Sequence, residues 1–231
     1  KSIPPDFLLA EVMRQLIILR DENQKRIKSL LENLTKTGNV ALSGEDIVNL
    51  IGQHLNCKGS SRLPVLIVAA AYRTIGNFIE ERILPILGHN TADKETGALG
   101  DLQVTLIDND NVVTSYEMKM KKVTMDDIDV ALHKIGSVDY KIDNYIFITT
   151  DEVDDAVKSY AKSLYDQTGG VEFVILDCIN FLRHFIHLFH RFRLQYVEEY
   201  QKLVMDESDS AVSQPLKEAF LALRQAAESS Y

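Results

Sequence analysis

Two short apolar runs constrain the fold of this chain more than any other sequence feature. They are NYIFITT at residues 144–150 and VEFVILDCI at residues 171–179. Each run has the length of a strand and is apolar throughout, which is typical of strands buried on both faces. A helical pattern at about 153–167, ending at Gly169 and Gly170, separates the two runs. The sequence therefore predicts a sheet with helices on both of its faces.

Two further strands are expected upstream, at about residues 100–107 and 112–121, joined by the turn DNDN. The preceding segment 65–87 is too long for a strand and carries isoleucines on one helical face, so we expect a helix there. Another helix is expected after Thr124, a residue suited to cap it. This alternating order predicts an α/β fold with a mixed central β-sheet flanked by helices.

Helical segments flank this central region on both sides. Apolar residues at helical spacing begin near the N-terminus, namely Phe7, Leu8, Val12, Leu16 and Leu19. A long helix at about 179–204 carries a stripe of phenylalanines, and a final helix is expected at about 216–228. We therefore divide the chain into a helical N-terminal region (1–62), a core (63–182) and a helical C-terminal region (183–231).

The composition favours a globular protein, because 45% of the 231 residues are hydrophobic and 26% are charged. There is no run of about 18 apolar residues that would span a membrane. Cys57 and Cys178 lack the spacing of a zinc site or a disulfide framework and are expected to be buried thiols. These features predict a cytoplasmic protein, in a bacterium if the resemblance described below holds. The chain starts at Lys1 rather than Met, so it can be a piece of a longer protein.

Strand periodicity sorts the charged residues of the segment 100–122. Glu117 and Lys119 project from one face of their strand, and Asp101 lies near the start of the preceding strand. If the strands form a hairpin, the two carboxylates converge on one point and need a cation, for which oxygen ligands and room for water suit Mg²⁺. A lysine beside such a metal can orient an attacking water, so the group is suited to metal-assisted hydrolysis of a phosphodiester.

An ordinary explanation competes with this one. A Glu-x-Lys triplet occurs by chance about once in a chain of this size, and solvent-facing strands often carry Glu and Lys. Three neighbours strengthen the functional interpretation: Gly100 directly before Asp101, an upstream helix carrying Glu80 and Glu81, and the helix that follows Lys122.

In this order of elements the chain resembles the PD-(D/E)XK nuclease superfamily, with Gly100-Asp101 in place of Pro-Asp. Five short segments are similar to type II restriction endonucleases of the SacI kind, and together they lie within residues 60–152: RLPVLIVAAAY (62–72), HNTAD (89–93), GALGDLQV (97–104), YEMKM (116–120) and YIFITT (145–150). The resemblance implies a restriction-endonuclease-like core and a Mg²⁺-dependent enzyme that cleaves double-stranded DNA at a specific sequence.

The resemblance also implies roles for individual residues. Asp101 and Glu117 would be metal ligands, with the carbonyl of Met118 a possible third, and Lys119 would position the attacking water. Glu80 resembles the helix glutamate that often completes such a site, and Glu81 is the competing choice because the helical wheel does not separate them. His89 and Asp93 have a turn-stabilising interpretation as well as one near the cleft.

The DNA-binding residues are less well defined. The net charge of −9 does not favour non-specific coating of nucleic acid, so contacts to phosphate depend on local basic groups. The candidates are Lys121, Lys122, Arg183 and Arg191, each of which can equally belong to a solvated surface. Two-fold symmetric DNA predicts a homodimer, with the terminal helices as its candidate interface. The alternatives to a restriction enzyme are a DNA repair nuclease or junction resolvase with the same core, and a non-catalytic interaction module.

Overall fold

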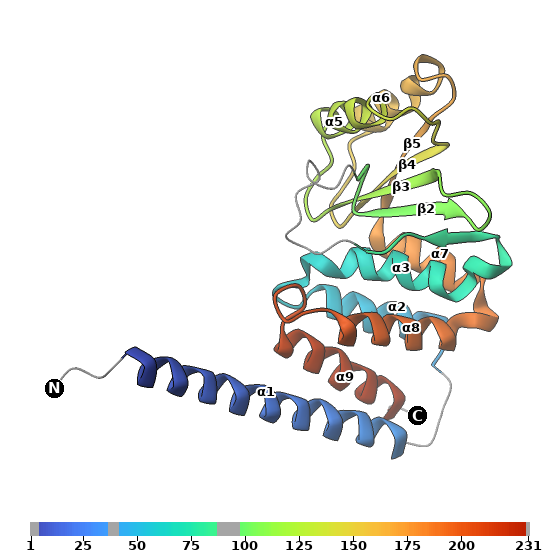
Figure 1. Ribbon diagram of the computed structural model, residues 1–231. Helices are drawn as coiled ribbons and strands as arrows, with labels where there is room; N and C mark the ends of the chain where they lie inside the picture. The colour runs from blue at the N-terminus through green and yellow to red at the C-terminus, as the bar shows by residue number, and fades with distance from the viewer. Residues whose placement is uncertain (1–4, 37–41, 87–97, 230–231) are drawn as a thin grey trace.

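The computed structural model describes residues 5–36, 42–86 and 98–229, and it centres on one five-stranded sheet (Figure 1). The strands are β1 (Glu81–Ile83), β2 (Leu102–Leu106), β3 (Val112–Lys119), β4 (Asn144–Thr149) and β5 (Glu172–Asp177), and they lie in sequence order across the sheet. The pairs β1–β2 and β2–β3 are antiparallel, whereas β3–β4 and β4–β5 are parallel. The predicted α/β class with a mixed sheet is confirmed.

Helices cover both faces of the sheet, as the apolar runs predicted. Helices α5 (Met125–Ile135) and α6 (Asp155–Gln167) lie over one face, and α3 (Leu63–Ile75) and α7 (Cys178–Leu188) lie on the other (Figure 1). In β4, Tyr145 and Phe147 pack in the apolar cluster beneath α5 and α6, while Ile148 packs in the cluster around α3. The alternation along β4 therefore gives each face its own core.

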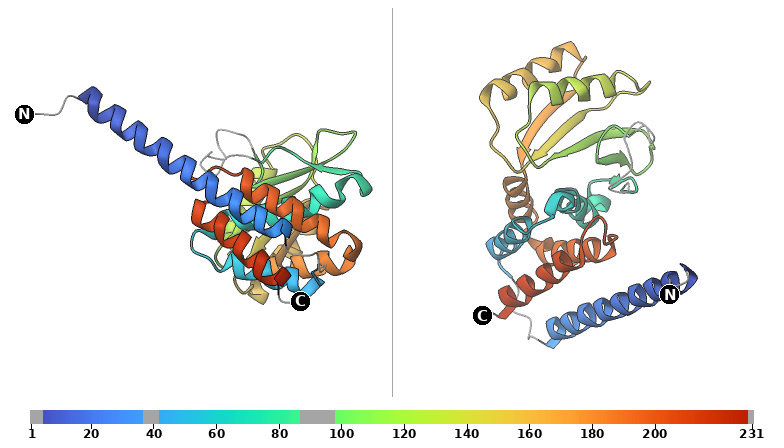
Figure 2. Two further views of the ribbon diagram at one scale, coloured as in Figure 1. Left: turned by 90° about the horizontal axis from the view of Figure 1, so that it is seen from below. Right: turned by 90° about the vertical axis from the view of Figure 1, so that its left-hand side faces the viewer.

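A helical body completes the molecule below α3. It consists of α2 (Gly44–Leu55), α8 (Arg193–Asp206) and α9 (Gln214–Ser229), and the long helix α1 (Pro5–Lys36) crosses beneath α9 (Figures 1 and 2). One apolar cluster joins Ile47 of α2, Leu66 of α3, Tyr200 of α8 and Phe220 of α9 to Val104 of the sheet. The N-terminal and C-terminal helical regions therefore share a core with the α/β region. No helix in the described residues is long and apolar enough to cross a membrane.

The helix expected over residues 65–87 is wrong in its second half. Helix α3 ends at Ile75, a short 3₁₀ turn η2 (Gly76–Phe78) follows, and the chain then pairs with β2 as β1. A Cβ at Gly76 would lie 2.5 Å from the carbonyl oxygen of Glu81, so this reversal requires a glycine. Ile83 continues the helical spacing in the sequence but pairs with Val104 in the sheet. A tertiary strand pairing has overridden the local helical pattern.

The single long helix expected over residues 179–204 is also wrong. It is divided into α7 and α8 by the 3₁₀ turn η3 (His190–Phe192), and Phe189 leaves helical geometry with φ −108° and ψ 41°. The phenylalanine stripe explains the break, because the ring centroid of Phe185 lies 5.2 Å from that of Phe189 and 5.3 Å from that of Tyr196. Folding α8 back beneath α3 buries Phe185 and packs Phe181, Phe189 and Phe192, which stay partly exposed, against the large apolar cluster.

Candidate active site

The carboxylate of Asp101 is held at the start of β2 by the backbone of β3. Its Oδ2 accepts a hydrogen bond from the amide of Met118, with an N to O distance of 2.7 Å. A Cβ at Gly100 would lie 2.5 Å from the carbonyl oxygen of Tyr116 and 2.6 Å from Oγ of Ser115. Glycine is therefore required before Asp101, because the chain entering β2 passes directly against β3. The register pairs Leu102 with Tyr116, and extending it by one residue would set Asp101 opposite Glu117.

Glu117 and Lys119 project from β3 toward α5 and contact each other. Lys119 Nζ lies 3.2 Å from Oε1 of Glu117, and their side chains are 21% and 16% exposed. The other carboxylate oxygen, Oε2, lies 3.3 Å from Nζ of Lys134 on α5 and 3.1 Å from the hydroxyl of Tyr145 on β4. Glu117 is thus placed between two ammonium groups in a partly buried position.

Asp127 holds the far side of Lys119. Its Oδ1 lies 3.1 Å from Nζ of Lys119, and its Oδ2 accepts hydrogen bonds from the amide and the hydroxyl of Thr124, in a capping box at the start of α5. Burial alone would raise the pKa of Asp127, but the hydrogen bonds from Thr124 and Lys119 outweigh it and lower the pKa. The cap of α5 therefore fixes a carboxylate against Lys119.

Lys119 is a stable cation in this arrangement. Burial tends to lower the pKa of its ammonium group, but the charges of Glu117 and Asp127 and the hydrogen bonds to both carboxylates raise it above the ordinary value. A lysine with a raised pKa donates hydrogen bonds and does not take up a proton near neutral pH. Lys119 is consequently equipped to orient an oxygen atom or to neutralise a phosphate rather than to act as a general base.

Tyr145 links the two chain segments that carry the candidate carboxylates. Its hydroxyl lies 2.7 Å from the carbonyl oxygen of Leu99 and 3.1 Å from Oε2 of Glu117. A phenol has one proton, so it can donate to only one of these oxygens at a time. The ring is buried and stacks on Phe173, with 5.8 Å between the ring centroids. Tyr145 therefore fixes Glu117 relative to the segment that leads into Asp101.

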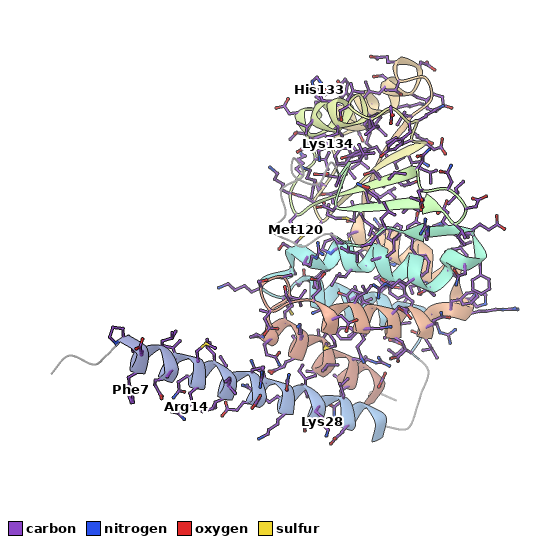
Figure 3. The ribbon with its side chains drawn as sticks, viewed as in Figure 1. Phe7, Arg14, Lys28, Met120, His133 and Lys134 are labelled. Carbon is purple, nitrogen blue, oxygen red and sulfur yellow. The ribbon has the colours of Figure 1, made fainter. Side chains whose placement is uncertain are left out.

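Sequence reasoning did not identify Asp127, Lys134 or Tyr145 as members of this group. Asp127 and Lys134 lie seven residues apart on α5, a spacing that places both on one helical face. Figure 3 shows Lys134 on the side of α5 toward the sheet and His133 on its outer side. That spacing was a signal, but it gains meaning only once α5 is known to lie over β3.

The structure does not bring Glu80 or Glu81 to Asp101. Glu80 has a left-handed backbone with φ 58°, and its carbonyl accepts a hydrogen bond from the amide of Ile107. Glu81 pairs with Leu106, four residues along β2 from Leu102, or about 13 Å. The prediction that Glu80 completes the site is wrong because β1 replaces the second half of the expected helix. His89 and Asp93 lie outside the described residues.

The residues beside Asp101 have the chemistry of a hard-cation site. In a strand, the amide and carbonyl of one residue point to the same side, so the Met118 carbonyl lies on the side of Asp101. With the carboxylates of Asp101 and Glu117 this gives an oxygen-only donor set that suits Mg²⁺. Within residues 5–36, 42–86 and 98–229, no three His, Cys, Asp or Glu side chains gather to hold a metal. A metal here would rely on two carboxylates, the carbonyl and water.

The four basic residues considered for DNA binding fall into two places. Lys121 and Lys122 follow β3 directly and are exposed; Nζ of Lys122 lies 2.7 Å from Asp154. Arg183 of α7 pairs with Glu45 of α2 in the helical body, with an N to O distance of 3.3 Å. Arg191 lies in η3, whose Phe192 packs on Phe78 near the start of β1. We term the charged side chains of Asp101, Glu117, Lys119, Asp127 and Lys134 the Glu117 group. Of the four basic residues, only Lys121 and Lys122 lie close to this group in the sequence.

The sequence was compared with protein-family models and with curated proteins. No protein-family model matches the sequence, and no significant match was found among curated proteins. The function has to be argued from the side chains that the fold brings together.

Proposed function

We propose that this protein is a Mg²⁺-dependent type II restriction endonuclease of the PD-(D/E)XK superfamily, which hydrolyses double-stranded DNA at a specific sequence. The observation that carries the proposal is the attachment of Asp101 to the Met118 amide, beside Glu117 and Lys119 on the same strand. The order of elements supports it: helix α3, the antiparallel strands β1 to β3, helix α5 and the parallel strand β4. Apart from β1, which was not expected, this order is the one on which the resemblance to the PD-(D/E)XK core rests.

The carboxylates of Asp101 and Glu117 and the carbonyl of Met118 would hold a Mg²⁺ ion, which would supply Lewis-acid catalysis to the phosphate and to the attacking water. Lys119 would direct its ammonium group toward the reacting phosphate and its attacking water. Asp127 keeps Lys119 charged and fixes its direction, because its own carboxylate is tied to the cap of α5. Pre-arranged charges of this kind stabilise the transition state without reorganisation.

The charge balance of the group favours cation binding. Asp101, Glu117 and Asp127 carry three negative charges, and Lys119 and Lys134 carry two positive ones. These five side chains therefore have an excess of one negative charge. Both lysines are 21% exposed, so water can solvate them if their contacts with Glu117 change.

The competing candidate is a non-catalytic module, and one observation favours it. Glu117 already has ionic or hydrogen-bonded partners at both of its oxygens, so the group can persist as an internal salt-bridge network without a metal. A repair nuclease or junction resolvase would use the same residues and differ only in the DNA that it accepts. Metal binding separates the module from the nucleases, and the DNA substrate separates the nucleases from one another.

The test combines DNA cleavage with one substitution. The protein is incubated with a mixed-sequence phage DNA with and without Mg²⁺, and discrete fragments are expected only with the metal. Lys119→Ala should lower the cleavage rate by about 10²–10³-fold, the scale of removing one transition-state donor, without loss of the fold. Lys202→Ala on α8 is the matched control and should cleave as the wild type does.

Each other outcome contradicts a defined part of the proposal. A smear of fragments would contradict sequence specificity, and cleavage of branched but not intact duplex DNA would favour a resolvase. If Lys119→Ala cleaves like the wild type, the assignment of the active site is wrong. If neither Mg²⁺ nor Mn²⁺ binds the wild-type protein in calorimetry, the non-catalytic module is the better description.

A further inference from the structure

The N-terminal half of α1 extends beyond the body of the protein (Figures 1 and 2). The C-terminal half is docked, with Ile27, Leu30 and Leu31 packed against the large apolar cluster. Figure 3 shows Phe7 and Arg14 on the extending half and Lys28 on the docked half. From Phe7 to Leu19 the large apolar side chains are 39–67% exposed. Such a density of exposed apolar groups on one segment is typical of a binding surface.

Four of these residues form a stripe of heptad type, which we term the α1 stripe: Leu9, Val12, Leu16 and Leu19. Their spacing of three, four and three residues is that of the contact positions in a helix pair. The stripe continues the docked face of α1, because Leu16 and Leu19 line a groove of about 540 Å³ together with Met205 of α8 and Gln214 of α9. One helical face therefore packs on the body at one end and lies open at the other.

We propose that the α1 stripe binds the α1 stripe of a second copy of this chain, in an antiparallel pair about a two-fold axis. In the antiparallel register, Leu9 packs on Leu19 of the second copy and Val12 packs on Leu16 of the second copy. The two-fold axis repeats both contacts, giving four apolar layers. The N-terminal part of each α1 then lies along the groove beside α8 and α9 of the other copy.

Charge complementarity selects this orientation. The same register places Asp6 opposite Arg20 of the second copy, at the flanking positions of the apolar seam, and symmetry makes two such pairs. In a parallel pair, these two positions of the two copies would lie on opposite sides of the seam, so Asp6 and Arg20 could not pair across it. Arg20 now pairs with the neighbouring Asp21 at 2.8 Å, and both side chains are about half exposed, so this contact is easily exchanged.

The charges of the segment disfavour other occupants. Residues 5–20 carry two acids, Asp6 and Glu11, and two bases, Arg14 and Arg20, so the net charge is zero. Helices that lie on anionic membranes are rich in Lys and Arg on their polar face, and nucleic acid likewise requires a cationic surface. A neutral, self-complementary helix is suited to its own copy. The inference does not depend on the proposed nuclease activity.

The first test measures mass by sedimentation equilibrium. The wild type is expected to be a dimer at micromolar concentration, and Leu9→Glu with Leu16→Glu should weaken association at least about 100-fold, because two charges would be buried in the seam. Ile17→Glu is the matched control: it lies on the same exposed turn but outside the seam, and it should leave the dissociation constant within about threefold. Since all three side chains are exposed, the variants should retain the fold.

The second test uses charge reversal to identify the register. Asp6→Arg should weaken the dimer about tenfold, and adding Arg20→Asp should restore it, because both pairs re-form with exchanged charges. A monomeric wild type at concentrations on the order of 100 μM would overturn the proposal, as would a dimer unaffected by the Leu9 and Leu16 substitutions. Failure of the second reversal to restore association, or co-sedimentation of a monomer with phosphatidylserine vesicles, would also overturn it.

Discussion

The Glu117 group under α5 and His54 in the helical body are both polar, and they are built in opposite ways. The Glu117 group consists of charged side chains that retain contact with water. His54 is fully buried and neutral: its Nδ1 lies 3.0 Å from the hydroxyl of Tyr200, and its Nε2 lies 3.0 Å from the carbonyl of Leu216. The side chains of the Glu117 group can exchange their partners for water, whereas each ring nitrogen of His54 has one fixed partner inside the protein.

This difference separates a group available for chemistry from one that stabilises the fold. Buried polar atoms with full hydrogen bonding make the packing around them specific, and they cost free energy when a partner is lost. Partly exposed charges contribute less to stability because water solvates them in either state. We therefore expect substitutions at the Glu117 group to alter activity and substitutions at His54 to alter stability.

The largest effect is expected for Glu117→Gln. Removing the charge of a proposed metal ligand should lower Mg²⁺-dependent cleavage at least about 10³-fold, or about 4 kcal/mol in the activation free energy, with a small change in the melting temperature. Glu80→Gln and Glu81→Gln are matched controls, because both residues lie near the other end of β2, and their rates should remain within about twofold of wild type. A similar loss in either control would restore the helix-glutamate hypothesis.

Substitution of His54 should have the converse effect. His54→Ala removes the contact of the Tyr200 hydroxyl and the side-chain hydrogen bond to the Leu216 carbonyl and opens a cavity, so the free energy of unfolding should fall by about 3–5 kcal/mol. His133→Ala, at an exposed position of α5, should change it by less than about 0.5 kcal/mol. Urea denaturation measures both variants. Equal stability of the two would contradict a structural role for His54.

The protonation of His54 gives a pH dependence with a defined sign. Burial lowers the pKa of His54 to about 4 from 6.5, although its hydrogen bond with the Leu216 carbonyl opposes the shift. The unfolded chain therefore binds the proton first as pH falls. The stabilisation from neutral His54 is complete above pH 6.5 and is lost progressively toward pH 4, by about 3 kcal/mol.

Denaturation of the wild type and of His54→Asn at several pH values measures the contribution of His54 protonation to the free energy of unfolding. The difference between their unfolding free energies should shrink between pH 6.5 and 4, because only the unfolded wild-type chain has a histidine at this position that binds a proton in this range. Carboxylates with lowered pKa values, such as Asp127, affect both proteins alike and cancel. A difference that stays constant with pH would contradict the buried neutral histidine.

The sequence predicts well those elements whose local pattern agrees with their tertiary contacts. Strands β4 and β5 follow from apolar runs whose side chains pack into the clusters on the two faces of the sheet, and α5 begins where Thr124 forms the expected cap. The failures occur where distant contacts outweigh the local period. The apolar spacing runs on past Gly76, but the chain reverses there to pair β1 with β2.

The candidate site divides in the same way. Strand periodicity is sufficient to place Glu117 and Lys119 on one face, because both lie on one strand. It does not reveal Lys134 or Asp127, since those residues reach Glu117 and Lys119 only when α5 folds back over β3. Asp127 moreover completes the capping box with Thr124, a role that would account for this residue without any contact to Lys119. A residue with two roles is assigned only one of them by a local pattern.

Tyr145→Phe should have the smallest effect, and it tests whether one residue can contribute both to stability, as His54 does, and to the proposed metal site, as the Glu117 group does. The tyrosine belongs to both kinds of environment, because its ring is buried and its hydroxyl contacts the carboxylate of Glu117. Removing the hydroxyl should cost about 1 kcal/mol of stability, the value of one hydrogen bond. It should also weaken Mg²⁺ binding by a few fold, since Glu117 loses a contact that directs it.

Calorimetric titration with Mg²⁺ and urea denaturation separate these two outcomes. Tyr160→Phe is the control. It also removes a tyrosine hydroxyl, in this case one on α6 that donates a hydrogen bond to Asp129 of α5. It should leave the Mg²⁺ dissociation constant unchanged. If Tyr145→Phe alters stability alone, its hydroxyl serves the Leu99 carbonyl and not Glu117. The carboxylate would then be held by the lysines, and its position would depend on charge rather than on the packing of β4.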